Sequence, residues 1–160
     1  MQEKETPNPA EITAIEALPA KGRIISIDPG TKRIGVAVSD ELQILARPVR
    51  VIARSGWKKL LLQIKDILTE FDAVALVIGL PYNFDGTESE MSEEARRMAR
   101  NFSKSLNVPV FLQDERATTY AARGRLWEQG LDRKEFAGRV DSEAASIILS
   151  DFLDRITTRR

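Results

Sequence analysis

Several acidic residues stand at positions where an apolar segment ends. Asp28 follows the apolar run in "IISIDPG", and Asp114 and Glu115 follow a second apolar run in "VPVFLQDE". Parallel strands of an open α/β sheet present their carboxyl ends to one crevice, so acids at two such ends are expected to converge. Facing carboxylates are costly unless a partner neutralises them, and a divalent cation is the partner that would explain several at once.

A fourth acid, Asp141, is placed by helical periodicity. It opens the stretch "DSEAASIILSDFL", in which Ala145, Ile148 and Phe152 follow at the spacing of one helical face. An acid that continues an apolar stripe faces the sheet that the stripe covers. Asp141 is therefore expected to point toward the same edge as the other acids.

Each acid also has a simpler explanation, and these alternatives stay open. Asp141 could be an ordinary helix N-cap, and Asp28 could be a turn residue. Asp114 and Glu115 could pair with the neighbouring Arg116. All four acids, however, stand at predicted ends of strands or of a helix that should meet at one edge of the sheet. This coincidence favours a metal-binding cluster over separate roles.

The composition limits the chemistry that is available. The chain has 160 residues, 42% of them apolar, which suits one compact domain, and it contains no cysteine and no histidine. A thiolate nucleophile, a Ser-His-Asp relay, an imidazole base and a thiolate or imidazole zinc site are therefore excluded. The metals that the remaining side chains serve well are hard, oxygen-seeking ions such as Mg²⁺ or Mn²⁺.

Charge is segregated along a chain whose formal net charge is zero. Residues 42–65 hold six basic side chains and no acid, residues 66–94 hold eight acids and no base, and residues 116–139 hold six basic side chains against three acids. Such segregation can give one electropositive face, which is what a phosphate backbone requires. The alternative is that these runs are only solvated helix faces.

Periodicity predicts an α/β domain with a mixed five-stranded sheet. The predicted strands are residues 23–27, 34–38, 44–52, 73–79 and 108–113, the first three forming an antiparallel meander. Pro48 indicates that the third strand is an edge or contains a bulge. The run "AVALVIG" does not alternate, which is typical of a strand covered on both faces.

Helical spacing predicts the connecting elements. A helix is expected from Trp57 to Phe71, and another after Thr87, which with Glu90 could form a capping box. Two more are expected over residues 118–129 and 141–156. The element order is βββαβαβα, with a further predicted helix near the C-terminus and no internal repeat or second domain.

Four segments of the chain resemble the signature blocks of one known family. "IISIDPGTKRIGVAVSD", "VIGLPYNFDGTES", "VPVFLQDERATTYAA" and "VDSEAASIILSDFL" are similar, in sequence and order, to blocks of the YqgF/RuvX family of the ribonuclease H-like superfamily. The likeness covers residues 23–153. It implies a ribonuclease H-like fold and a metal-dependent nuclease, associated with maturing the ends of precursor 16S ribosomal RNA and earlier proposed to cut Holliday junctions and other branched DNA.

The resemblance also implies roles for individual residues. Asp28, Glu115 and Asp141 match the three catalytic, metal-binding acids of the family, and Asp114 is a further candidate ligand. In the wider superfamily such a cluster holds two Mg²⁺ or Mn²⁺ ions, one activating a water and the other stabilising the leaving 3′ oxygen.

Nucleic-acid contacts are expected beside these acids. Gly30 would allow close approach of the backbone, Lys32, Arg33 and Arg116 are candidate phosphate contacts, and Thr118 lies in the same matched segment. The implied partners are structured RNA or branched DNA and a ribosome precursor, with no membrane, and the protein is expected to be a monomer or homodimer.

Two other classes compete with a nuclease. Asp-x-Gly-Thr after a first strand also resembles the phosphate-binding hairpin of actin-like and sugar-kinase ATPases, but these need a second copy of the domain, and this chain has one such hairpin. A binding module without catalysis would not need all three acids.

The ends of the chain are expected to lie outside the folded domain. The polar, proline-containing residues 1–22 are predicted to be a flexible tail with a short helix over residues 11–18, residues 23–156 the nuclease domain, and residues 157–160 a C-terminal tail. The start of the chain does not resemble a signal peptide, no segment is long and apolar enough for a membrane helix, and a cytoplasmic protein is expected.

Overall fold

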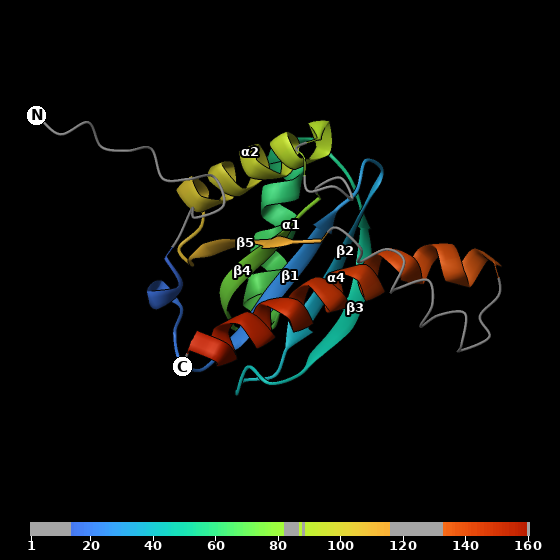
Figure 1. Cartoon of the computed structure of the whole chain (residues 1–160). Helices are drawn as coiled ribbons and strands as arrows, with labels where there is room; N and C mark the ends of the chain where they lie inside the picture. Colours follow the sequence, from blue (N-terminus) through green and yellow to red (C-terminus); the bar gives the residue numbers. More distant parts are fainter. Residues whose placement is uncertain (1–13, 82–86, 88, 116–132, 160) are drawn as a thin grey trace, which may run out of the picture.

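Five strands form one mixed sheet between two layers of helices (Figure 1). The computed structural model describes residues 14–81, 87, 89–115 and 133–159. The strands are β1 (Arg23–Pro29), β2 (Arg33–Ser39), β3 (Ala46–Ala53), β4 (Ala73–Leu80) and β5 (Val110–Asp114), in the spatial order β3-β2-β1-β4-β5. The first three strands are antiparallel, and β4 and β5 continue the sheet in parallel. The predicted mixed sheet and its meander are confirmed.

The helices divide between the two faces of the sheet. Helices α1 (Trp57–Glu70) and α2 (Glu90–Ser105) cover one face, and the long helix α4 (Arg133–Arg159) crosses the other (Figure 1). Before β1, the described chain holds one short 3₁₀ turn, η1 (Ile15–Ala17), within the predicted helix 11–18. The predicted helix 118–129 lies outside the described residues. No helix among the described residues is long and apolar enough to span a membrane.

Two apolar cores lie on opposite faces of the sheet. In β1, Ile25 and Ile27 join the core beneath α1 and α2, whereas Ile24 joins the core beneath α4. In β4, Ile78 and Val77 are divided in the same way. Since side chains alternate across a strand, a strand covered on both faces must be apolar at successive positions, which explains the uninterrupted runs in the sequence.

The third strand begins later than predicted, at Ala46. One carboxylate oxygen of Asp40 accepts hydrogen bonds from the backbone N–H groups of Ile44 and Leu45, both at 2.8 Å. These bonds stabilise a loop in which both apolar side chains are exposed. The expectation about Pro48 is confirmed, because β3 is an edge strand and its pairing with β2 shifts register there.

The cap of α2 differs from the predicted one. The N-cap is Ser89, whose hydroxyl accepts a hydrogen bond from the Ser92 N–H at 3.1 Å, while the Ser92 hydroxyl accepts one from the Ser89 N–H at 2.8 Å. The predicted box of Thr87 and Glu90 was wrong, because a serine at the third helical position closes the box as well as an acid does.

Helix α4 begins eight residues before the predicted position. Residue 141 therefore lies inside the helix, so the prediction that it opens the helix, and the alternative that it is an N-cap, were both wrong. The preceding charged stretch contains no proline and mostly good helix formers, and one interior glycine costs only about 1 kcal/mol. The predicted stripe is confirmed, since Ala145, Ile148 and Phe152 are fully buried against the sheet.

A glycine brings α4 into contact with the sheet at this position. Gly35 of β2 pairs with Asp28 of β1, and a Cβ atom at Gly35 would lie 1.8 Å from the backbone oxygen of Asp141. The main chain of α4 thus rests directly on β2. This close approach places Asp141 one strand away from Asp28.

We expect Gly35→Ala to destabilise the protein by about 1–3 kcal/mol, because an atom inserted between two backbones cannot be absorbed by a side-chain rotation. Gly56→Ala is the matched control, since a Cβ atom there meets nothing within 4 Å. Urea unfolding of both variants measures the difference. Equal stability of the two variants would contradict the close contact between α4 and β2.

Candidate active site

Asp28 stands near the end of β1, next to a tight turn. Its backbone oxygen accepts a hydrogen bond from the Gly30 N–H at 3.0 Å, and the chain then reverses into β2. A Cβ atom at Gly30 would lie 2.4 Å from the backbone oxygen of Arg33, so the turn has room only for glycine. The Asp28 carboxylate is thereby held at the edge of the sheet where β1, β4 and β5 end.

Glu115 reaches the same edge from the other side of β4. Its backbone N–H donates to the Leu80 oxygen at 3.2 Å, which continues the pairing of β5 with β4. A Cβ atom at Gly79 would lie 2.9 Å from a carboxylate oxygen of Glu115. Because Gly79 has no side chain, the Glu115 carboxyl group can lie over β4 and form a hydrogen bond with Asp28.

The two carboxyl groups share a proton. Burial raises the pKa of Asp28 to about 6; the hydrogen bond from Glu115 opposes this rise and the nearby charge of Asp141 adds to it. Burial, the negative charge of Asp28 and the hydrogen bond to it together raise the pKa of Glu115 to about 10. At neutral pH, Glu115 is therefore the protonated donor and Asp28 the charged acceptor, as expected for two adjacent buried acids.

Asp141 is held beside this pair by a basic residue. Arg33 Nε lies 3.0 Å from Asp141 Oδ2, and the side chains are 51% and 23% exposed, respectively. Oδ2 is itself buried and accepts no hydrogen bond from the described residues, so the contact is an ion pair alone. Burial raises the pKa of Asp141, and the Arg33 charge opposes that rise.

These acids have the chemistry of a site for a hard cation. They offer only carboxylate oxygens, two of the groups are in contact, and a buried oxygen of the third has no hydrogen-bond donor among the described residues. Within residues 14–81, 87, 89–115 and 133–159, however, no three acidic groups lie close enough together to hold an ion. The structure thus shows a pair of acids, with Asp141 nearby and paired to Arg33.

Three of the other predicted site residues lie next to Asp28 or Glu115, and two lie outside the described residues. Asp114 ends β5, and its charge raises the pKa of Glu115. Gly30 and Lys32 form the turn after Asp28, where the Lys32 side chain is exposed. The candidate nucleic-acid contacts Arg116 and Thr118 lie outside the described residues.

Arg54, which follows β3, supports the site and was not assigned a role from the sequence. Its guanidinium donates from Nη1 to the Gly30 oxygen at 3.0 Å and forms an ion pair with Glu94 of α2. Its backbone N–H donates to the Lys32 oxygen at 2.9 Å. In the sequence, Arg54 is one member of a basic run, and nothing local indicates contacts with residues 24 and 40 positions away.

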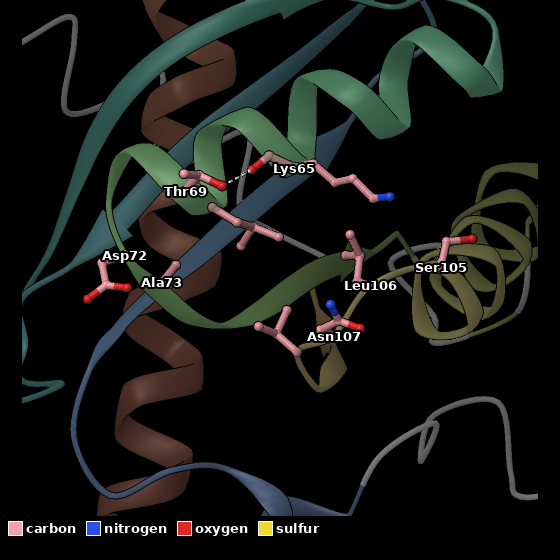
Figure 2. A pocket seen from close by; sticks show the side chains of 9 residues that line it. Lys65, Thr69, Asp72, Ala73, Ser105, Leu106 and Asn107 are labelled. Atoms are coloured by element: carbon pink, nitrogen blue, oxygen red, sulfur yellow. Dashed lines mark hydrogen bonds between the residues drawn. The ribbon is translucent and has the colours of Figure 1, made fainter.

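A hollow lies at the end of the sheet opposite the acids. It has a volume of about 420 Å³ and lies where β4 begins and where α1 and α2 end. Figure 2 shows Lys65 and Thr69 on one side, with Leu106 and Asn107 on the other. Asp72 is the only acid that lines this hollow, so it does not share the chemistry of the paired carboxylates.

Comparison with known proteins places the chain in a family. The model of the family described as "RuvX: Holliday junction resolvase" matches residues 22–155. The chain belongs to the RuvX family. The predicted family membership is confirmed, and so is the prediction that the protein is an enzyme of the nuclease class.

Relatives in the RuvX family match over most of their length. A protein of Anaeromyxobacter sp. (strain Fw109-5) named "Putative pre-16S rRNA nuclease" is 40% identical over 132 residues, 82% of this chain and 96% of its own. A protein of the same name from Rhodobacter capsulatus is 41% identical over 140 residues, 88% of each chain.

Solved structures share the fold at low sequence identity. Thermus thermophilus RuvC in complex with a Holliday junction substrate matches with a TM-score of 0.51 at 16% identity, over 85% of this chain and 97% of that one. The fowlpox virus resolvase in complex with Holliday junction DNA matches with a TM-score of 0.50 at 12% identity, over 84% and 98%. The predicted ribonuclease H-like fold of this RuvX family member is confirmed.

The shared proton should make the stability of the metal-free protein depend on pH. Folding raises the pKa of Asp28 and Glu115, so above the unfolded-state pKa the folded protein holds more protons than the unfolded chain. From about pH 5 to about pH 8 the free energy of unfolding should therefore fall, by up to ~1.4 kcal/mol per pH unit for each retained proton. Glu115→Gln should flatten this dependence on pH. The measurement is urea unfolding at several pH values, with EDTA present to keep the protein metal-free.

The control for this experiment is Asp40→Asn. Hydrogen bonds from the backbone, the largest contribution from Leu45, lower the pKa of Asp40, so this acid is ionised in both states throughout that range. Asp40→Asn should keep the wild-type slope. A wild-type slope that persists in Glu115→Gln above about pH 7, where Asp28 is already ionised, would show that Glu115 does not retain the proton.

Proposed function

We propose that this protein is a metal-dependent nuclease that hydrolyses phosphodiester bonds in processing the ends of precursor 16S ribosomal RNA. The observation that carries the proposal is the buried Asp28–Glu115 pair, with Asp141 beside it, at the edge where the strands end. The names of the 40% identical relatives support the RNA substrate. We place this activity in the cytoplasm, where ribosome precursors mature.

Asp28, Glu115 and Asp141 would hold Mg²⁺ or Mn²⁺, with Asp114 as a further candidate ligand. The bound ions would supply an activated water and stabilise the leaving oxygen, which explains why a chain without histidine can carry out hydrolysis. Before binding, the proton on Glu115 limits the repulsion between two buried carboxylates. Arg33 has the same effect on Asp141.

The protein's own contribution is positioning and a low local dielectric. A backbone hydrogen bond and the Arg54 side chain fix the Asp28 turn, and the largely buried carboxyl groups sit where charges interact more strongly than in water. Arg33 and Lys32 are exposed beside the acids, so they can contact phosphates on either side of the scissile bond. Gly30 is a further proposed contact in the same turn, and Arg116 and Thr118, which follow Glu115 in the sequence, are proposed contacts from the family resemblance.

Exposed basic residues of α1 are proposed to extend the binding surface, and those of β3 lie farther along the sheet, where Arg50 forms an ion pair with Glu70. Arg47, Arg50, Lys58 and Lys59 are exposed, and they belong to the stretch that contains no acid. Their contacts with phosphates would not depend on base sequence, and binding should weaken as salt rises. Structured RNA is the proposed partner, bound by a monomer or a homodimer.

Cleavage of branched DNA is the second candidate function. The description of the matching family model is the observation that favours it. Metal ions held by the carboxylates, together with basic side chains, would contact the phosphates of DNA and RNA alike.

Divalent metal should raise the melting temperature of the wild type, because an ion that binds only the folded state stabilises it by mass action. We expect a shift of several degrees at millimolar Mg²⁺ or Mn²⁺, and a much smaller one in Asp28→Asn. Differential scanning fluorimetry against metal concentration provides the measurement. The same shift in wild type and Asp28→Asn would rule out this cluster as the metal site.

Asp28→Asn, Glu115→Gln and Asp141→Asn should each lower Mn²⁺-dependent cleavage by about a thousandfold or more, since the acids act as one unit. Variants with two of these substitutions should lose little more cleavage activity than variants with one. The assay compares a precursor 16S RNA end with a four-way DNA junction at one salt concentration, with circular dichroism as the folding control. Faster cleavage of the junction would favour the second function, and near-wild-type cleavage by Asp28→Asn would refute the mechanism.

A further inference from the structure

A second, smaller cleft opens at the catalytic end of the sheet, between α1 and α2. Its volume is about 160 Å³, which is room for about ten water-sized groups and suits one flat ring system. Trp57 and Arg54 line it on the side of α1, and Arg97 and Asn101 line it on the side of α2. It is separate from the larger hollow, which lies where both helices end.

Arg54 connects this cleft to the acids. The same guanidinium that lines the cleft donates to the Gly30 oxygen, two residues after Asp28. Its ion pair with Glu94 ties the first turns of α2 to the catalytic turn. The acids face α4, because Asp28 lies on the same side of β1 as Ile24 and Ser26, and the cleft lies on the other face, between α1 and α2. A strand whose phosphate lies at the acids would pass over the turn at Gly30 to bring a nearby nucleotide to the cleft.

The lining residues have the chemistry that recognises an unstacked nucleotide. Aromatic rings and guanidinium groups stack on bases, and an asparagine amide can donate to and accept from a base edge. The Trp57 ring rests on Phe102, with ring centroids 4.8 Å apart, so it is held in place before any ligand arrives. Arg97 is exposed and makes no ion pair or hydrogen bond within the described residues, which leaves its charge available for a phosphate.

We propose that the cleft between α1 and α2 is a subsite for a nucleotide that flanks the scissile phosphate in a single-stranded part of the substrate. The base lies against Trp57 and Asn101, and Arg97 contacts the phosphate. The subsite rests on the proposed nuclease function and specifies its substrate further. A nucleotide next to the cut must be unpaired to enter a cleft of this size.

Fluorescence of Trp57 offers a test that does not depend on cleavage. The chain has two tryptophans, and Trp127→Phe leaves Trp57 as the only one. A single-stranded RNA oligonucleotide, titrated in EDTA, should change the Trp57 emission as it binds. Binding of a labelled oligonucleotide, followed by anisotropy at several salt concentrations, gives the affinity and its salt slope.

Arg97→Ala, made in the Trp127→Phe background, should weaken binding at least fivefold, reduce the salt slope by about one, and diminish the Trp57 response. Arg100→Ala is the matched control, because this exposed arginine of the same helix does not line the cleft. It should change affinity less than twofold and keep the response.

The outcomes separate the subsite from the function on which it rests. Binding with an unchanged Trp57 emission, or equal losses in Arg97→Ala and Arg100→Ala, would overturn the subsite and leave the nuclease proposal intact. A wild-type protein that binds neither single-stranded nor structured RNA would overturn both. A fully base-paired oligonucleotide should bind without the Trp57 response, and an equal response to it would also refute the subsite.

Discussion

The burial of two carboxyl groups side by side is the constraint on which the rest of this structure depends. A charged pair at that position would repel in a medium that screens poorly, so the folded protein keeps one proton on Glu115 and directs it at Asp28. Such a pair stabilises the fold less than apolar side chains would. Its presence at the edge of the sheet fits the proposed function, in which a cation would replace the proton.

Two glycines make this arrangement sterically possible. Gly79 leaves space over β4 for the Glu115 side chain, and Gly35 lets the main chain of α4 rest on β2. A side chain at either position would meet a carboxylate or a backbone oxygen. The apolar cores on the two faces then hold in place the strands and α4, which carry the acids.

Basic residues surround the pair without entering it. Arg33 pairs with Asp141, while Arg54 binds the turn after Asp28 and reaches α2 through Glu94. The two arginines differ in what they can do for a substrate. Arg33 is half-exposed and close to the acids, whereas Arg54 is engaged on both sides and is better suited to hold the turn in position.

The sequence by itself determined the order of the strands along the chain, the two-sided burial of the sheet and the meeting of Asp28 with Glu115. Uninterrupted apolar runs required cover on both faces, and Asp28 and Glu115 stood at strand ends that a parallel arrangement brings together. Local patterns misplaced the starts of β3 and α4 and the cap of α2. In those places hydrogen bonds accepted by the Asp40 carboxylate, a serine box or a weak helix breaker decided between alternatives of similar energy.

Only the tertiary structure decided which acid carries the proton, which arginine pairs with Asp141 and which one holds the turn after Asp28. Those outcomes depend on desolvation and on contacts between residues far apart in the chain, as between Arg33 and Asp141 or Arg54 and Glu94. Gly35 and Gly79 belong to the same class, since neither has the positive φ that would mark a turn. Their role is to leave room for a neighbour, and a neighbour exists only once the chain has folded.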